Sequence, residues 1–197
     1  MLKSWFRNPR MKKYSSKRPT GLLPLRDIRT ALALLDGTEP DCLRYSDRIE
    51  AFMQEYGIAV SFIFLDLRKI GKNTEVYACG REVMNRADID WLGIPKGIAK
   101  WRKKSALLKP ETDLFISFIG SDDYTSRFIS SAVSAGFKIG VSAYQGNPFD
   151  LVITDGGDDC PSGLPEDESM KKSDACGNVP DTPAKIEAIC NFLKQII

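Results

Sequence analysis

The sequence predicts a three-layer α/β domain, with a mainly parallel, Rossmann-like sheet of about four to six strands and helices on both faces. The segment Thr112–Ile153 reads as strand, helix, strand, loop and strand. The run Ile58–Leu67 is apolar over most of its length, which is typical of a strand buried on both faces. Amphipathic segments flank these strands. Because parallel strands need long crossovers, this alternation favours a parallel sheet.

The central segment contains the clearest strand–helix–strand unit. Leu114–Ile119 is a short apolar run and predicts a buried strand. Apolar residues then recur at helical spacing over residues 122–135, and Gly136 is expected to end this helix. Phe137–Val141 and Leu151–Ile153 predict two further strands. A helix between two parallel strands implies a right-handed crossover.

Three further helices are expected outside this unit. Residues 25–35 carry apolar side chains at helical spacing, and Gly37 follows as a stop signal. Residues 45–56 form a second amphipathic segment. The third covers residues 183–196, with Thr182 as its cap and proline at the first helical position.

Charge divides the chain into regions. Residues 1–20 are a basic N-terminal extension, and residues 21–197 form a single α/β domain. Within that domain, residues 155–181 hold eight acidic residues against two lysines, with frequent glycine and proline. Such a segment buries too little apolar surface to order itself, so we expect a flexible acidic loop.

The basic extension has two interpretations. It is either an arm that contacts nucleic acid or anionic lipid, or a helical extension whose aromatic residues pack on the domain. The second is favoured because the rest of the chain adds no basic face. Under the first, the contacts would come from Lys3, Arg7, Arg10, Lys12 and Lys13, with Trp5, Phe6 and Tyr14 interleaved.

Composition excludes several classes of site. The chain has no histidine, which removes Ser–His and Cys–His nucleophile pairs and histidine-liganded zinc. The five cysteines include no CxxC pair, which favours free thiols in a reducing compartment. No secretory signal is recognisable, and the longest apolar run is far shorter than the ~20 residues of a membrane span. We therefore expect a cytoplasmic protein without a cofactor.

Candidate site residues follow the ends of the predicted strands, where ligands bind in open α/β sheets. Asp66 and Asp122 are the candidate catalytic residues. The candidates for ligand binding are Gly120, Ser121, Asp123 and Ser142.

Two chemistries compete with a structural role at these positions. Gly120 and Ser121 could hold a phosphate at a helix N-terminus, but Asp122 and Asp123 would repel it and are suited to helix capping. Asp66, Asp122, Asp123 and Asp155 could instead bind Mg²⁺ through carboxylate oxygens. Capping is the more common role of such residues, so we expect no metal site.

Four short motifs and one tyrosine stand out in the middle and end of the domain. They are DIDWLGIP (Asp88–Pro95), TDLFISF (Thr112–Phe118), Tyr124, SAGFKIGV (Ser134–Val141) and FDLVI (Phe149–Ile153). Through them the chain resembles an uncharacterised family of Bacteroidetes proteins, a domain of unknown function, which implies no activity. The pattern DLFIS, a helix and GFKIGV is also similar to half of the N-terminal Rossmann-like domain of heptosyltransferase-type glycosyltransferases. That similarity implies architecture alone, because a second nucleotide-sugar-binding domain does not fit in this length.

The favoured function is therefore a non-catalytic binding or interaction module. The absence of histidine and of nucleotide-binding motifs supports it. The alternative is a small enzyme, with or without Mg²⁺, that acts on a nucleotide-linked or phosphorylated substrate at the carboxyl ends of the strands.

Overall fold

The computed structural model describes residues 2–68, 81–96, 112–120, 123–143, 146–153 and 182–196, with side chains from residue 5 onward. In this part of the chain, six strands form one sheet in the order β3-β2-β1-β4-β5-β6, and every neighbouring pair is parallel. This is the strand order of doubly wound folds. The strands are β1 (Thr30–Asp36), β2 (Ala59–Asp66), β3 (Glu82–Asn85), β4 (Thr112–Ser117), β5 (Ala135–Gly140) and β6 (Leu151–Val152).

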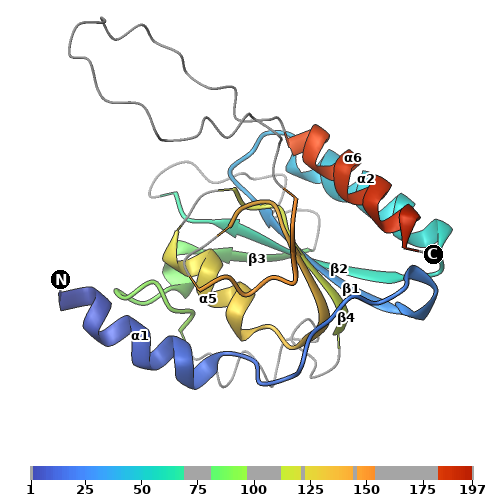
Figure 1. The fold of residues 1–197 in the computed structure, drawn as a ribbon. Coiled ribbons are helices and arrows are strands. Elements are labelled where there is room, and N and C mark those ends of the chain that lie inside the picture. Colours follow the sequence, from blue (N-terminus) through green and yellow to red (C-terminus); the bar gives the residue numbers. More distant parts are fainter. Residues whose placement is uncertain are drawn as a thin grey trace, which may run out of the picture.

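Helices cover both faces of this sheet, which confirms the predicted three-layer α/β fold (Figure 1). Helices α2 (Cys42–Glu55) and α6 (Thr182–Gln195) lie side by side on one face. Helix α5 (Tyr124–Ala132) lies on the other, and α1 (Leu2–Tyr14) packs beside it. The predicted helices at 45–56, 122–135 and 183–196 correspond to α2, α5 and α6. Two 3₁₀ turns complete the described elements, η1 (Leu25–Asp27) and η2 (Arg86–Asp88).

The helix predicted over residues 25–35 is wrong. Only η1 is helical there, and the chain then enters β1, which pairs with β2 on one side and β4 on the other. Alanine and leucine are strong helix formers, so composition and spacing both favoured a helix. Pairing on both edges and burial on both faces outweigh that local preference, because β1 has five consecutive buried residues, from Ala31 to Leu35.

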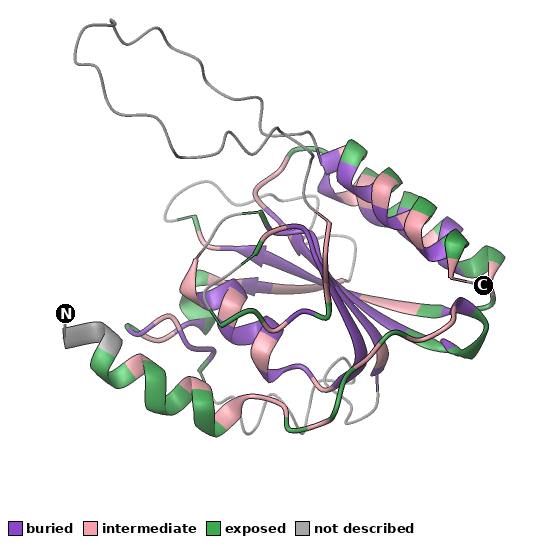
Figure 2. Cartoon of the chain, viewed as in Figure 1, coloured by how far each residue is buried: buried purple, intermediate pink, exposed green. Residues whose placement is uncertain are grey.

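Two apolar layers hold the helices to the sheet, and the strands are buried along most of their length (Figure 2). Ala33, Leu35 and Phe137 belong to the layer that packs against α2 and α6. The alternate residues Leu32 and Leu34 belong to the layer beneath α5. Side chains of a strand point to opposite faces in turn, so one strand serves both layers.

Gly136 lies within β5 and does not end the preceding helix, as had been expected. Helix α5 ends four residues earlier, at Ala132. The chain segment that leaves α1 passes directly over Gly136, where an added Cβ would lie 2.9 Å from Leu23 Cδ1 and 3.2 Å from the carbonyl oxygen of Asp113. Glycine is therefore needed here for a close approach and not for a turn.

Two charged side chains on the strands, Asp113 and Lys138, form hydrogen bonds that stabilise the sheet. Asp113 of β4 accepts hydrogen bonds from the Arg29 and Thr30 amides, both at 2.9 Å, and from the Thr30 hydroxyl at 3.0 Å. Burial alone would raise the pKa of Asp113, but these bonds outweigh it and lower the pKa. The carboxylate thereby ties the beginning of β4 to the beginning of β1.

Lys138 of β5 is only 3 % exposed and lies beneath α5. Its Nζ donates a hydrogen bond of 2.7 Å to the Ser130 carbonyl oxygen. The Asp150 carboxylate accepts a bond from the Lys138 amide at 2.8 Å and another from the Thr20 hydroxyl. Burial lowers the pKa of Lys138 from 10.5 to about 8, although the charge of Asp150 opposes the shift.

Candidate functional site

The carboxyl ends of the six described strands lie at one edge of the sheet, because all of these strands are parallel. The strand order reverses between β1 and β4, and ligands of doubly wound folds bind outside the strand ends at such a point. A hollow of about 130 Å³ lies there. Its walls come from the ends of β1 and β2, from the segments after β1, β2 and β4, and from the residue before α5: Asp36, Thr38, Leu65, Leu67, Ile119 and Asp123.

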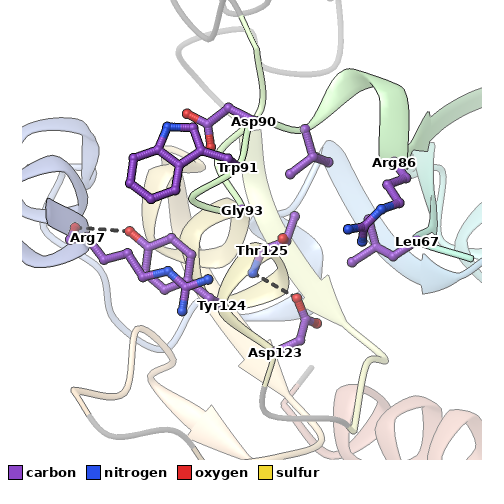
Figure 3. Close-up of a pocket in the computed structure, with 10 residues that line it drawn as sticks. Arg7, Leu67, Arg86, Asp90, Trp91, Gly93, Asp123, Tyr124 and Thr125 are labelled. Carbon is purple, nitrogen blue, oxygen red and sulfur yellow. Dashed lines mark hydrogen bonds between the residues drawn. The ribbon is translucent and has the colours of Figure 1, made fainter. Parts of the chain in front are cut away.

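A larger cavity of about 370 Å³ adjoins this hollow, and the two share Leu67 and Asp123. It is within the usual size range of small-molecule sites, roughly 300–1,000 Å³. Its walls come from α1, the end of β2, the segment after β3 and the first turn of α5 (Figure 3). The lining residues are Arg7, Leu67, Arg86, Ile89, Asp90, Trp91, Gly93, Asp123, Tyr124 and Thr125.

A tight turn at Asp90 forms one wall. The Asp90 carboxylate accepts hydrogen bonds from the amides of Leu92 (2.8 Å) and Ile94 (2.9 Å). Gly93 has a φ of +87°, a conformation that other residues rarely adopt. Leu92 and Ile94 are buried by this turn, whereas the Trp91 ring is left 64 % exposed at the cavity mouth.

The opposite wall is an arginine–tyrosine contact between α1 and α5. The Arg7 guanidinium carbon lies 4.1 Å from the centre of the Tyr124 ring, and Arg7 Nε donates a 2.8 Å hydrogen bond to the Leu92 carbonyl oxygen. The Tyr124 hydroxyl donates a 3.0 Å bond to the Arg7 carbonyl oxygen. Burial raises the pKa of Tyr124, although the Arg7 charge lowers it in part. These contacts fix the cavity wall in place.

The two acidic groups of the cavity have structural partners. Asp123 caps α5 by accepting bonds from the Thr125 amide at 2.7 Å and the Ser126 amide at 3.1 Å. Asp90 accepts the two turn amides and lies 3.4 Å from an Arg10 nitrogen. By contrast, the Arg86 guanidinium makes no hydrogen bond or ion pair within the described part of the chain. Within the described residues, the cavity therefore holds a cation that forms no ion pair with the acids beside it.

Asp66, a predicted catalytic residue, is only 3 % exposed and lines neither cavity. Its two carboxylate oxygens accept bonds from Arg68 Nε at 3.0 Å and Arg68 Nη2 at 2.9 Å. The hydrogen bond to Asp66 raises the pKa of Arg68. This pairing gives Asp66 a structural role at the end of β2.

The other predicted site residues are distributed differently. Asp123 lines both cavities, whereas Ser142 lines neither. Gly120 leaves room for α6, because a Cβ there would lie 3.2 Å from Nζ of the buried Lys185. Asp122 and Ser121 lie outside the described residues, as does Asp155.

Metal and phosphate binding find little support in the described residues. No group of three or more aspartate, glutamate, cysteine or histidine residues is arranged to hold a metal ion in the described ranges. The Thr125 and Ser126 amides in the first turn of α5 are already bonded to Asp123, so a phosphate could not use them. Burial raises the pKa of Cys42 and of Cys190 to about 11, which keeps both thiols protonated at neutral pH.

Several lining residues were not anticipated from the sequence. Asp36 and Thr38 were hidden by the incorrect helix over residues 25–35. Trp91 and Gly93 belong to DWLGIP, whose glycine and proline signal a turn, and this was the one available hint. Arg86 carried no signal, because nothing local indicates that η2 comes near the first turn of α5.

Comparison with known proteins gives a family but no activity. The model of a family of unknown function (DUF6913) matches residues 4–162, so the chain belongs to this family. No curated protein and no solved structure matches the chain. In the described segments, no helix has both the length and the apolar character needed to cross a membrane.

Proposed function

We propose that this member of the family is a binding module whose larger cavity takes a small organic anion with a planar group. The observation that carries the proposal is Arg86, a cation without a partner among the described residues, in a cavity whose acids are already bonded. An anionic group of the ligand would pair with Arg86, because a guanidinium binds carboxylates and phosphates in a two-pronged geometry.

The aromatic side chains at the cavity support a planar portion in the ligand. Trp91 presents an exposed ring at the mouth, and Tyr124 forms part of the wall. Stacking of a flat group on the exposed Trp91 ring stabilises a complex at little cost in side-chain entropy, whereas one face of Tyr124 is already covered by Arg7. Nucleotides, sugar nucleotides and aromatic carboxylates all combine a planar group with an anion and belong in the first screen.

A binding role is favoured over catalysis because the carboxylates in and near the cavity already have structural partners. Asp90 and Asp123 accept backbone amides, and Asp66 is paired with Arg68 away from the cavity. Each of these carboxylates is engaged in the fold, which favours a structural role over an acid–base role. Turnover of a bound nucleotide or sugar nucleotide would instead establish the enzyme alternative.

The proposal is tested by a thermal-shift screen of the full chain, followed by calorimetry on each compound that raises the melting temperature. Arg86→Ala should weaken binding about 10- to 100-fold, since a charged hydrogen bond contributes about 1.5–3 kcal/mol. Arg26→Ala is the matched control, because Arg26 is an exposed arginine in η1, before β1. Equal affinities of Arg86→Ala and the wild type, or no stabilising compound in the screen, would overturn the proposal.

The cellular setting forms part of the same proposal. Five cysteines without a CxxC pair support a reducing compartment, and we place the protein in the cytoplasm of a bacterium of the Bacteroidetes. The strand order supports an architectural relation to the N-terminal domain of heptosyltransferase-type enzymes. That relation extends to nucleotide-sugar binding only if sugar nucleotides emerge from the screen.

A further inference from the structure

Three large aromatic side chains gather on the surface where α1 meets the Asp90 turn. Trp5 is 74 % exposed, Phe6 is 41 % exposed and Trp91 is 64 % exposed. The ring centres of Trp5 and Phe6 are 5.0 Å apart, and those of Phe6 and Trp91 are 6.3 Å apart. They therefore form one contiguous apolar patch, which soluble surfaces rarely leave uncovered without an interaction partner.

The opposite side of α1 holds the helix on the domain. The Tyr14 ring lies 6.1 Å from the Phe128 ring of α5, and Met11 packs in the same small cluster. Arg7 contributes its contact with Tyr124. The aromatic residues of the extension thus divide between two roles, because Tyr14 packs on the domain as expected, whereas Trp5 and Phe6 remain exposed.

The exposed side of α1 is also positively charged. The first 18 residues contain seven basic residues and no acidic one. Of these, Arg7 and Arg10 have partners on the Asp90 turn, whereas Lys12 and Lys13 are exposed on the helix surface. Exposed aromatic residues beside lysines are the combination found in helices that lie in the interface of an anionic bilayer.

We propose that Trp5, Phe6, Trp91, Lys12 and Lys13, the aromatic–lysine face, bind the surface of an anionic lipid bilayer. Tryptophan and phenylalanine would enter the headgroup region, and the lysines would pair with lipid phosphates and carboxylates. The helix would lie along the surface and not cross it. Trp91 belongs to both this face and the cavity, but the inference does not depend on the proposed cavity ligand, because Trp5, Phe6, Lys12 and Lys13 do not line the cavity.

Two other occupants fit this face less well. A second copy of the chain would bring two positively charged helices together, which is electrostatically unfavourable. Single-stranded nucleic acid would stack successive bases on free ring faces. Here the central ring, Phe6, packs edge to face against both neighbours, at 68° with Trp5 and 65° with Trp91, so only the two outer rings are left for stacking.

The test is co-sedimentation of the full chain with phosphatidylcholine vesicles, with and without phosphatidylserine, supported by the tryptophan emission maximum. We expect binding and a blue shift only when phosphatidylserine is present. The double variant Trp5→Ala/Phe6→Ala should lower the partition coefficient about tenfold or more. Lys12→Gln/Lys13→Gln should lower it about tenfold at low salt and much less at high salt.

Matched controls separate this surface from general charge and hydrophobicity. Leu22→Ala removes an exposed apolar side chain elsewhere, and Arg26→Gln/Arg44→Gln removes two exposed cations from other elements. Both should bind vesicles as the wild type does. The inference is overturned if phosphatidylserine vesicles are not bound or if the aromatic double variant binds them equally well. It is also overturned by a dimer that this variant dissociates, or by tighter binding to DNA or RNA than to vesicles.

Discussion

Replacing Lys138 with methionine would measure the cost of burying an ammonium group beneath α5. The pKa of Lys138 is about 8 in the folded protein, against 10.5 without burial. Below pH 8 both states carry the proton and the folded state bears the full cost of desolvation. As pH rises from 8 to 10.5, the unfolded state binds more protons than the folded state, so stability increases with pH.

The size of this effect follows from the shift. One pKa unit corresponds to about 1.4 kcal/mol, so the full interval between 8 and 10.5 is worth about 3 kcal/mol. About 1.4 kcal/mol of it should develop between pH 7 and pH 9. Cys42 and Cys190 act in the opposite direction, because burial raises each pKa from 9.0 to about 11 and stability then falls as pH rises through that range. Both thiols contribute equally to the wild type and to Lys138→Met, so the difference between the two proteins isolates the lysine.

Urea unfolding at pH 7, 8 and 9 provides the assay, with equal m-values confirming that midpoints can be compared. The wild type should gain about 1.4 kcal/mol relative to Lys138→Met over this range. Lys12→Met, which removes an exposed lysine, should keep the pH dependence of the wild type. Parallel curves for the wild type and Lys138→Met would refute the assignment of the lowered pKa to this buried side chain.

Three more substitutions test the fold by urea unfolding. Gly140→Ala should cost about 1–3 kcal/mol, because a Cβ would lie 2.5 Å from carbons of the Phe149 ring. Asp66→Asn should cost about 2 kcal/mol by weakening the pair with Arg68, yet change cavity affinity less than about twofold. Asp113→Asn should cost about 1–3 kcal/mol above pH 5. Because the folded pKa of Asp113 is lowered, its contribution is present above the unfolded pKa of 3.8 and is lost as pH falls through the folded value.

Controls for these three lie elsewhere on the chain. Gly21→Ala places a Cβ where no heavy atom lies within 4 Å, so it should be nearly neutral. Asp41→Asn removes an exposed carboxylate that makes no capping bond, so it should leave both stability and its pH dependence unchanged. A loss in either control as large as in its partner variant would remove the explanation offered for that partner.

The local pattern of apolar runs, glycines and capping residues was sufficient to predict most of the fold. The strand at Ile58–Leu67 and the unit from Thr112 to Ile153 were predicted in the right order, since apolar runs, glycine and capping residues are all local signals. The central strand β1 was missed because Ala31–Leu35 satisfies helical spacing and strand burial equally well. Pairing with the neighbouring strands β2 and β4 decides in favour of a strand, and β4 is about 80 residues away in the sequence.

The candidate site was harder to predict, because most of its lining residues come from segments that are distant in sequence. Asp123 was anticipated because it follows a predicted strand and precedes a helix. Arg86 and Trp91 reach the cavity through the packing of α1, η2 and α5, segments that are distant in sequence. Asp66 has the position expected of a catalytic residue, at the end of a predicted strand. The sequence does not show whether its carboxylate is open to a ligand or, as in the structure, paired with Arg68.

Helix α6 lies beyond residue 162, where the family match ends, yet Ile186, Ile189 and Leu193 are buried in the layer shared with α2 and the sheet. A chain shortened to the matched region would therefore keep every described strand but lose α6. The apolar sheet face that α6 covers would then be exposed to water. Recombinant fragments designed from the family boundaries alone should precipitate, whereas those that retain residues 182–196 should stay in solution.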